Sequence, residues 1–148
     1  MHREYAERRR RVIDSMGQGT MIIFSAPVTI RNNDVEHDYR QDSDFYYLTG
    51  LDEQDSVLVL VADSPSPFSL FVRSRDPDRE TWDGERIGVD GALERFGANV
   101  AYSKTELVER LFELLKGQTR LYYALGRNEK YDTLVLDVLR RLRERSRR

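Results

Sequence analysis

The side chains best suited to chemistry are concentrated between Arg31 and Gly50. This stretch combines acids, an arginine and aromatic residues with almost no aliphatic content, so it is not built only for a core. Four neighbouring side chains in it could in principle bind a divalent metal ion: Asp34, Glu36, His37 and Asp38. Their spacing meets neither the HExxH nor the EF-hand pattern, and consecutive acids more often form a solvated loop. Metal binding here is therefore the less favoured hypothesis.

Catalytic side chains are otherwise scarce. The only histidines are His2 and His37, and neither lies near a sequence typical of a nucleophile elbow. Cysteine is absent, which excludes thiolate nucleophiles, disulfides and zinc–thiolate sites. The glycines match neither GxGxxG nor GxxxxGK, so no phosphate loop is predicted. The sequence therefore predicts no catalytic centre within this chain.

The run from Tyr39 to Asp44 allows two interpretations. In the favoured one, Asp42 or Ser43 caps a short helix carrying core aromatic residues, and Arg40 forms a structural ion pair. In the other, Arg40 and Asp34 line a binding surface.

The only tryptophan, Trp82, lies in a segment rich in charged residues that runs to Gly88. An exposed tryptophan is typical of interfaces and ligand sites. The alternative, a tryptophan packed on its own domain's sheet, is equally compatible with the composition.

Composition bounds the class of protein. The chain has 148 residues, a net charge of -2 and 39% hydrophobic residues, which suits one ordinary globular domain over residues 1–148. The basic run Arg140–Arg148 fits the dipole at a helix C-terminus, and no matching basic face suggests nucleic acid. There is no apolar leader or membrane-length apolar run, so we expect a cytoplasmic location and no membrane partner.

Hydrophobic periodicity predicts strands that alternate with helices, and hence an α/β sheet. We expect strands over Thr20–Ser25, Ser56–Ala62, Phe68–Arg73, Ala98–Tyr102 and Arg120–Ala124, the second and third forming a hairpin that makes the sheet mixed. Helices are expected over Tyr5–Met16, around Phe45–Leu48, over Val89–Phe96, behind a capping box at Ser103–Glu106, and from Tyr131. The segment between Arg73 and Val89 is expected to be irregular.

Several of these segments together carry a resemblance to a known family. They are Ile22–Pro27 (IIFSAP), Arg31–Asp34 (RNND), Tyr39–Gly50 (YRQDSDFYYLTG), Arg75–Asp76 and Glu80–Gly88 (ETWDGERIG). In content and spacing the chain resembles, over nearly its whole length, the amino-terminal domain of aminopeptidase P, a Xaa-Pro aminopeptidase of the creatinase/prolidase superfamily.

This resemblance implies a mixed, about six-stranded sheet flanked by helices. It also implies a longer metallopeptidase that releases the N-terminal residue preceding proline from peptides. Two manganese ions, bound by two Asp, one His and two Glu, would lie in a carboxy-terminal catalytic domain absent from this chain. The chain alone would hold no metal and would be inactive. Its partners would be that catalytic domain and further copies of itself, as a dimer or tetramer.

Three site residues are implied by the same resemblance. Asp34 would join a hydrogen-bond network reaching toward the metal centre. Trp82 would reach across a subunit interface to wall a neighbour's active site. Arg147 would face the substrate region. Two alternatives stay open: a stand-alone interaction module with this fold, and the amino-terminal domain of a sister enzyme such as prolidase or creatinase.

Overall fold

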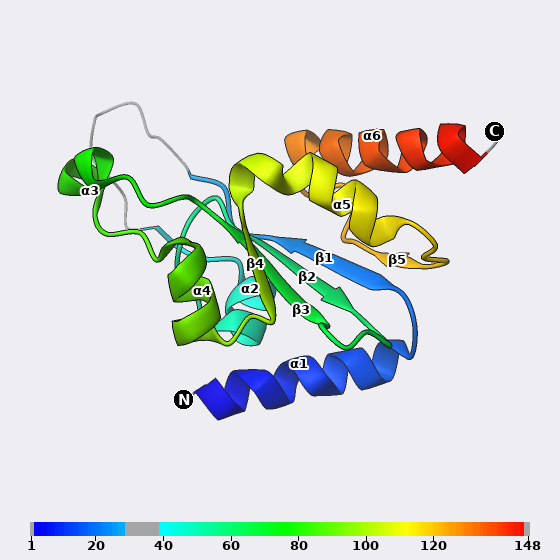
Figure 1. Ribbon diagram of the computed structural model, residues 1–148, viewed down its shortest axis with the longest axis horizontal. Coiled ribbons are helices and arrows are strands. Elements are labelled where there is room, and N and C mark those ends of the chain that lie inside the picture. Colours follow the sequence, from blue (N-terminus) through cyan, green and yellow to red (C-terminus); the bar gives the residue numbers. More distant parts are fainter. Residues whose placement is uncertain (1, 29–38, 147–148) are drawn as a thin grey trace.

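The computed structural model describes residues 2–28 and 39–146. Five strands form one mixed sheet in the order β4-β3-β2-β1-β5 (Figure 1): β1 (Thr20–Phe24), β2 (Val57–Val61), β3 (Phe68–Val72), β4 (Val100–Ser103) and β5 (Leu121–Tyr122). The pairs β1–β2 and β2–β3 are antiparallel, whereas β3–β4 and β1–β5 are parallel. The predicted mixed α/β class is confirmed, with five described strands where about six were expected.

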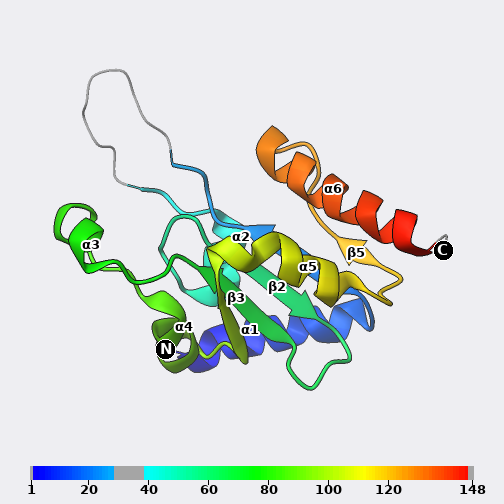
Figure 2. The ribbon, with the colours of Figure 1, turned by 45° about the horizontal axis from the view of Figure 1, so that its top comes forward.

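The sheet is covered on both faces because its central strands bury every side chain. Helices α5 (Leu107–Leu115) and α6 (Glu129–Ser146) pack on one face, and α1 (His2–Met16), α2 (Ser43–Thr49) and α4 (Gly88–Phe96) lie on the other (Figures 1 and 2). Alternate residues of β2 accordingly enter different cores. Val57, Val59 and Val61 pack with α5 and α6, and Leu58 and Leu60 pack on the opposite side. None of the helices in the described ranges is long and apolar enough to cross a membrane.

Two local expectations were wrong. The segment predicted to be irregular contains a helix, α3 (Pro77–Asp83), with Asp76 at its N-cap and proline in its first turn. The expected capping box does not form either. The Ser103 side chain accepts a hydrogen bond from Thr105 N–H at 3.4 Å, and a 3-10 turn, η1 (Lys104–Glu106), precedes α5. The Glu106 carboxylate instead contacts Arg110, one turn further along.

Helix α1 is fixed to the body of the domain by a buried arginine. Arg9 Nη1 donates a hydrogen bond of 2.8 Å to the Leu48 carbonyl in α2, and its guanidinium lies 3.9 Å from the centre of the Phe68 ring. Burial lowers the pKa of Arg9 to about 10, so the charge persists at neutral pH. The arginine-rich helix α1 therefore contributes a buried structural cation, Arg9, to the domain.

Helix α2 ends beside the Tyr5 ring of α1. Its C-cap, Gly50, has φ 70°, and its N–H donates to the Tyr46 carbonyl at 2.8 Å. A Cβ at Gly50 would lie 2.7 Å from the Tyr5 ring, so any side chain there requires that ring to move.

We therefore expect Gly50→Ala to lower the free energy of unfolding by more than the left-handed conformation alone costs, which is about 1–2 kcal/mol. Gly117→Ala is a matched control, since Gly117 has φ 76° and open space around it. Denaturant unfolding of both variants measures the difference. Equal losses would show that the Tyr5–Gly50 contact contributes nothing.

Candidate functional site

Trp82 lies on a part of the molecule that stands away from the sheet. It is 88% exposed on α3, a helix without buried residues, at the end of the molecule opposite the C-terminus (Figures 1 and 2). Of the two interpretations of this tryptophan, the structure supports the exposed one. A large apolar side chain presented this way is suited to contact another polypeptide or a ligand.

A single carboxylate, Glu80, holds the loop around α3. Its Oε1 accepts hydrogen bonds from Arg86 N–H at 2.7 Å and Arg75 Nε at 2.8 Å, and its Oε2 accepts one from Asp76 N–H at 2.8 Å. The side chain is only 7% exposed. These bonds, the one from Arg86 N–H above all, lower the pKa of Glu80 below its ordinary value. Both ends of the α3 segment are thus tied to one side chain two residues from Trp82.

A second buried carboxylate, Glu53, ties the base of this segment to the sheet. Its Oε1 accepts from Ile87 N–H at 3.2 Å and lies 3.4 Å from Arg73 Nη2. Burial raises the pKa of Glu53. Arg86 Nη1 adds a bond of 3.1 Å to the Ser74 carbonyl. Because α3 buries no residue of its own, these polar contacts determine where Trp82 lies.

The structure does not bring the other two candidate residues to Trp82. Asp34 and Arg147 both lie outside the described residues. Arg40 is exposed and forms no ion pair with another described residue, so the expected pair was not found there. Among the aromatic residues of α2, Phe45 is fully buried, but Tyr46 and Tyr47 are half-exposed, which corrects the expectation that this cluster is core.

The described residues offer no metal site. In residues 2–28 and 39–146, no group of three His, Cys, Asp or Glu side chains could hold a metal ion. The cluster Asp34, Glu36, His37 and Asp38 falls outside these ranges.

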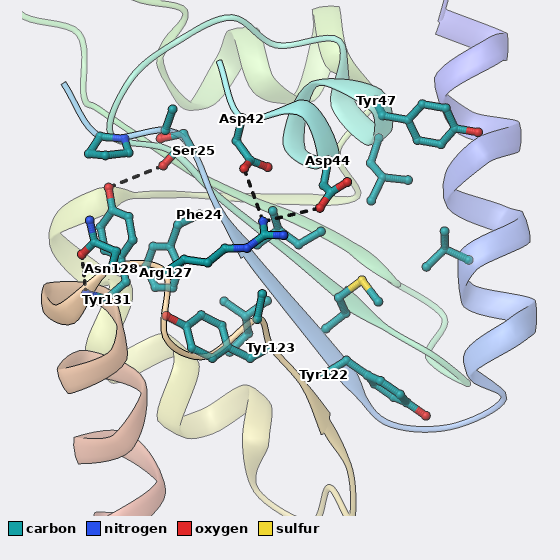
Figure 3. Close-up of a pocket in the computed structure, with 18 residues that line it drawn as sticks. Phe24, Ser25, Asp42, Asp44, Tyr47, Tyr122, Tyr123, Arg127, Asn128 and Tyr131 are labelled. Atoms are coloured by element: carbon teal, nitrogen blue, oxygen red, sulfur yellow. Dashed lines mark hydrogen bonds and ion pairs between the residues drawn. The ribbon is translucent and has the colours of Figure 1, made fainter. Parts of the chain in front are cut away.

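A cavity of about 510 Å³ lies where the parallel strands β1 and β5 separate (Figure 3). Its volume is within the ~300–1,000 Å³ range of ligand pockets. One wall is aromatic, since the Phe24 ring stacks on Tyr131 at 4.2 Å and meets Tyr123 edge-on at 6.0 Å. Val12, Met21 and Leu48 line the side facing α1 and α2.

Few polar groups enter this cavity. The Arg127 side chain reaches across it, 3.9 Å from Asp42 and 3.8 Å from Asp44 (Figure 3). Arg127 is 66% exposed, so these long ion pairs are weak. Burial raises the pKa of Tyr123 and Tyr131, so both phenols stay protonated at neutral pH.

Sequence reasoning missed this cavity, although it had a signal. Two polar residues, Arg127 and Asn128, lie just beyond the predicted strand Arg120–Ala124, and ligands in open α/β sheets gather outside the carboxyl ends of strands. Using that signal required knowing that the first and last strands are parallel neighbours.

Comparisons with known proteins agree on one family. The model of the family described as "Aminopeptidase P, N-terminal domain" matches residues 5–136. The chain is 39% identical to the Xaa-Pro aminopeptidase of Escherichia coli, over 97% of this chain and 33% of that protein. It is 34% identical to human Xaa-Pro aminopeptidase 3, over 95% of this chain and 30% of that protein.

Solved structures give the same result. The structure of Pseudomonas aeruginosa aminopeptidase PepP is 42% identical with a TM-score of 0.94, covering 99% of this chain and 34% of that one. A zinc-substituted Escherichia coli aminopeptidase P in complex with product is 37% identical, with a TM-score of 0.92 and the same coverage. The chain spans about a third of the length of the relatives it matches.

The role of Glu80 yields a prediction that Trp82 itself can report, because it is the only tryptophan. In Glu80→Gln, one carboxylate oxygen becomes an amide nitrogen facing a donor, so we expect α3 to become mobile and the fluorescence anisotropy of Trp82 to fall. Since the folded pKa of Glu80 is lowered, its bonds are intact above the ordinary pKa and are lost as pH falls through the folded value. Acidification should therefore mobilise Trp82 in the parent chain but not in the variant.

The exposed neighbour Glu85, which belongs to neither network, provides the control Glu85→Gln. An anisotropy that falls equally in both variants would contradict the role given to Glu80.

Proposed function

The chain belongs to the family of aminopeptidase P amino-terminal domains, and from that membership we propose that it is the non-catalytic domain of a manganese-dependent Xaa-Pro aminopeptidase. Such an enzyme releases the N-terminal residue that precedes proline. The proposal is supported by the identity to full-length Xaa-Pro aminopeptidases over nearly all of this chain. Since the chain covers about a third of those relatives, the proposed reaction centre belongs to a second, carboxy-terminal domain.

The metal ions of the proposed reaction do not fit the described part of this chain. No suitable ligand cluster exists in residues 2–28 and 39–146. We propose that two manganese ions bind in the catalytic domain. They would supply a polarised water and a polarised carbonyl there. Residues 1–148 then form one domain whose contribution is to shape access and assembly.

The observation that carries this role is Trp82, exposed on a helix that polar contacts hold away from the sheet. We propose that Trp82 contacts a neighbouring subunit of a dimer or tetramer. There it helps to form the wall of that subunit's active site, where proline-containing peptides bind. Asp34 and Arg147 are proposed as further supporting residues on the substrate side. The proposed location is the cytoplasm.

The first test is the size and activity of the native protein. An antibody raised against this chain should detect a band about three times the chain's 17.4 kDa in source cells. The immunopurified protein should cleave Xaa-Pro peptides of three or more residues with manganese(II), and a chelator should abolish cleavage. The 148-residue chain should be inactive with or without manganese(II).

Other outcomes discriminate the alternatives. A native band at the size of this chain would replace the peptidase proposal with a stand-alone interaction module. Cleavage confined to dipeptides would assign the chain to a prolidase. Peptidase activity of the isolated chain would contradict the proposal that the reaction centre belongs to a second domain.

A second test concerns Trp82 in the full-length enzyme. Because its side chain is exposed, Trp82→Ala should leave the free energy of unfolding of the domain within about 0.5 kcal/mol. It should weaken subunit association and lower kcat/KM, measured by sedimentation and peptide hydrolysis. Trp82→Phe, which keeps an aromatic ring, should restore part of both. Unchanged assembly and kinetics in Trp82→Ala would remove the interface role.

A further inference from the structure

The backbone of β1 faces two different neighbours in alternation. Gly19 C=O accepts from Ala62 N–H at 3.0 Å, and Ser25 N–H donates to Ser56 C=O at 2.9 Å, so the odd-numbered residues between them bond to β2. The even-numbered residues face the other way. Thr20 N–H, for example, donates to the Arg120 carbonyl at 3.0 Å.

The strand on that second side stops early. Pairing between β1 and β5 ends at Met21 and Tyr122, although β1 continues to Phe24. No hydrogen bond among the described residues engages Phe24 N–H or Phe24 C=O. Beyond this point the edge is occupied, because Ala26 N–H donates to Gln41 Oε1 at 2.8 Å and Ala26 C=O accepts from Tyr39 Oη. One short piece of strand edge is thus left open, centred on Phe24.

This open edge borders the cavity between β1 and β5 (Figure 3). Met21 and Ile23 point to the α1/α2 side and are only half-buried, while Phe24 and Tyr131 form the wall on the other side. A backbone laid along β1 would therefore find apolar surface for side chains on both of its faces. At the mouth, two carboxylates, Asp42 and Asp44, share the single guanidinium of Arg127.

We propose that this cleft binds an extended peptide of a partner protein, which adds to the sheet beside Phe24 and carries a basic residue toward Asp42 and Asp44. The peptide backbone forms hydrogen bonds with Phe24 N–H and Phe24 C=O, whereas a purely apolar ligand would leave both groups unpaired. Its alternate side chains enter the two apolar walls. The basic residue complements the excess carboxylate at the mouth. The site is separate from Trp82 and does not depend on the peptidase proposal.

Backbone pairing makes a specific prediction for N-methyl peptides. The probe is a synthetic peptide of alternating valine and threonine preceded by lysine, titrated into the isotope-labelled 148-residue chain and followed by NMR. Only every second N–H of an added strand points at β1. Methylation at those positions should weaken binding about tenfold or more, and at the intervening positions by less than about twofold. The Phe24 amide should gain protection from hydrogen exchange on binding.

A matched pair of protein variants locates the site. Ala124 is exposed and lines the cavity, so Ala124→Trp should block the peptide. Leu125 is exposed next to it but does not line the cavity, so Leu125→Trp should bind normally. Replacing the probe's lysine by glutamate should weaken binding to the parent chain, and Asp44→Asn should reduce that charge preference.

Three results would overturn the proposal. One is no binding, or binding that Ala124→Trp leaves intact. Another is equal sensitivity to N-methylation at every position, which would indicate an apolar pocket without strand pairing. The third is a dimer of the chain that Ala124→Trp dissociates, which would assign the edge to a second copy.

Discussion

The complete burial of β2 is the constraint on which the rest of the structure depends. All five of its side chains, from Val57 to Val61, are buried, and each buried Val or Leu contributes about 1.5–3 kcal/mol relative to exposure. A strand apolar on both faces requires a strand on either side and a helical layer above and below. The antiparallel neighbours β1 and β3 meet the first requirement, and the helices meet the second, with α5 and α6 on one face and α1, α2 and α4 on the other. Even Arg9, in the charged helix α1, is used to close one of these layers.

The proposed contact residue Trp82 lies apart from the core that stabilises the domain. The core holds the sheet and its helices, whereas α3 buries nothing and depends on Glu80 and Glu53 for its position. An apolar residue such as Trp82 can therefore be presented to a partner without weakening the core. The cleft beside Phe24 shows the opposite arrangement, because there the recognition surface is the unfinished edge of the core sheet itself.

Much of this fold follows from sequence patterns. The runs at Ser56–Ala62 and Phe68–Arg73 predicted the hairpin, and the spacing of Tyr131, Val135 and Val138 predicted the last helix, because burial imposes those periods. Helix α3 was not predicted because polar contacts hold it in place. Such contacts produce no periodic pattern of apolar residues in the sequence. The capping box was missed because Ser103 bonds one residue closer than the motif assumes. The cavity was missed because it depends on the pairing of β1 with β5, which are far apart in the sequence, and local sequence patterns do not specify that pairing.

The parallel pairing of β1 with β5 also has a consequence for synthesis on the ribosome. Thr20 and Met21 pair with Leu121 and Tyr122, so β1 receives this neighbour only after the chain has been translated through β5. The β1–β2 and β2–β3 pairings can form earlier, since all of their residues lie between Thr20 and Phe71. Until then the outer edge of β1 is an exposed template of the kind that promotes aggregation. The charged helix α1 directly precedes β1 in the sequence, and charged residues that flank an exposed strand oppose such aggregation.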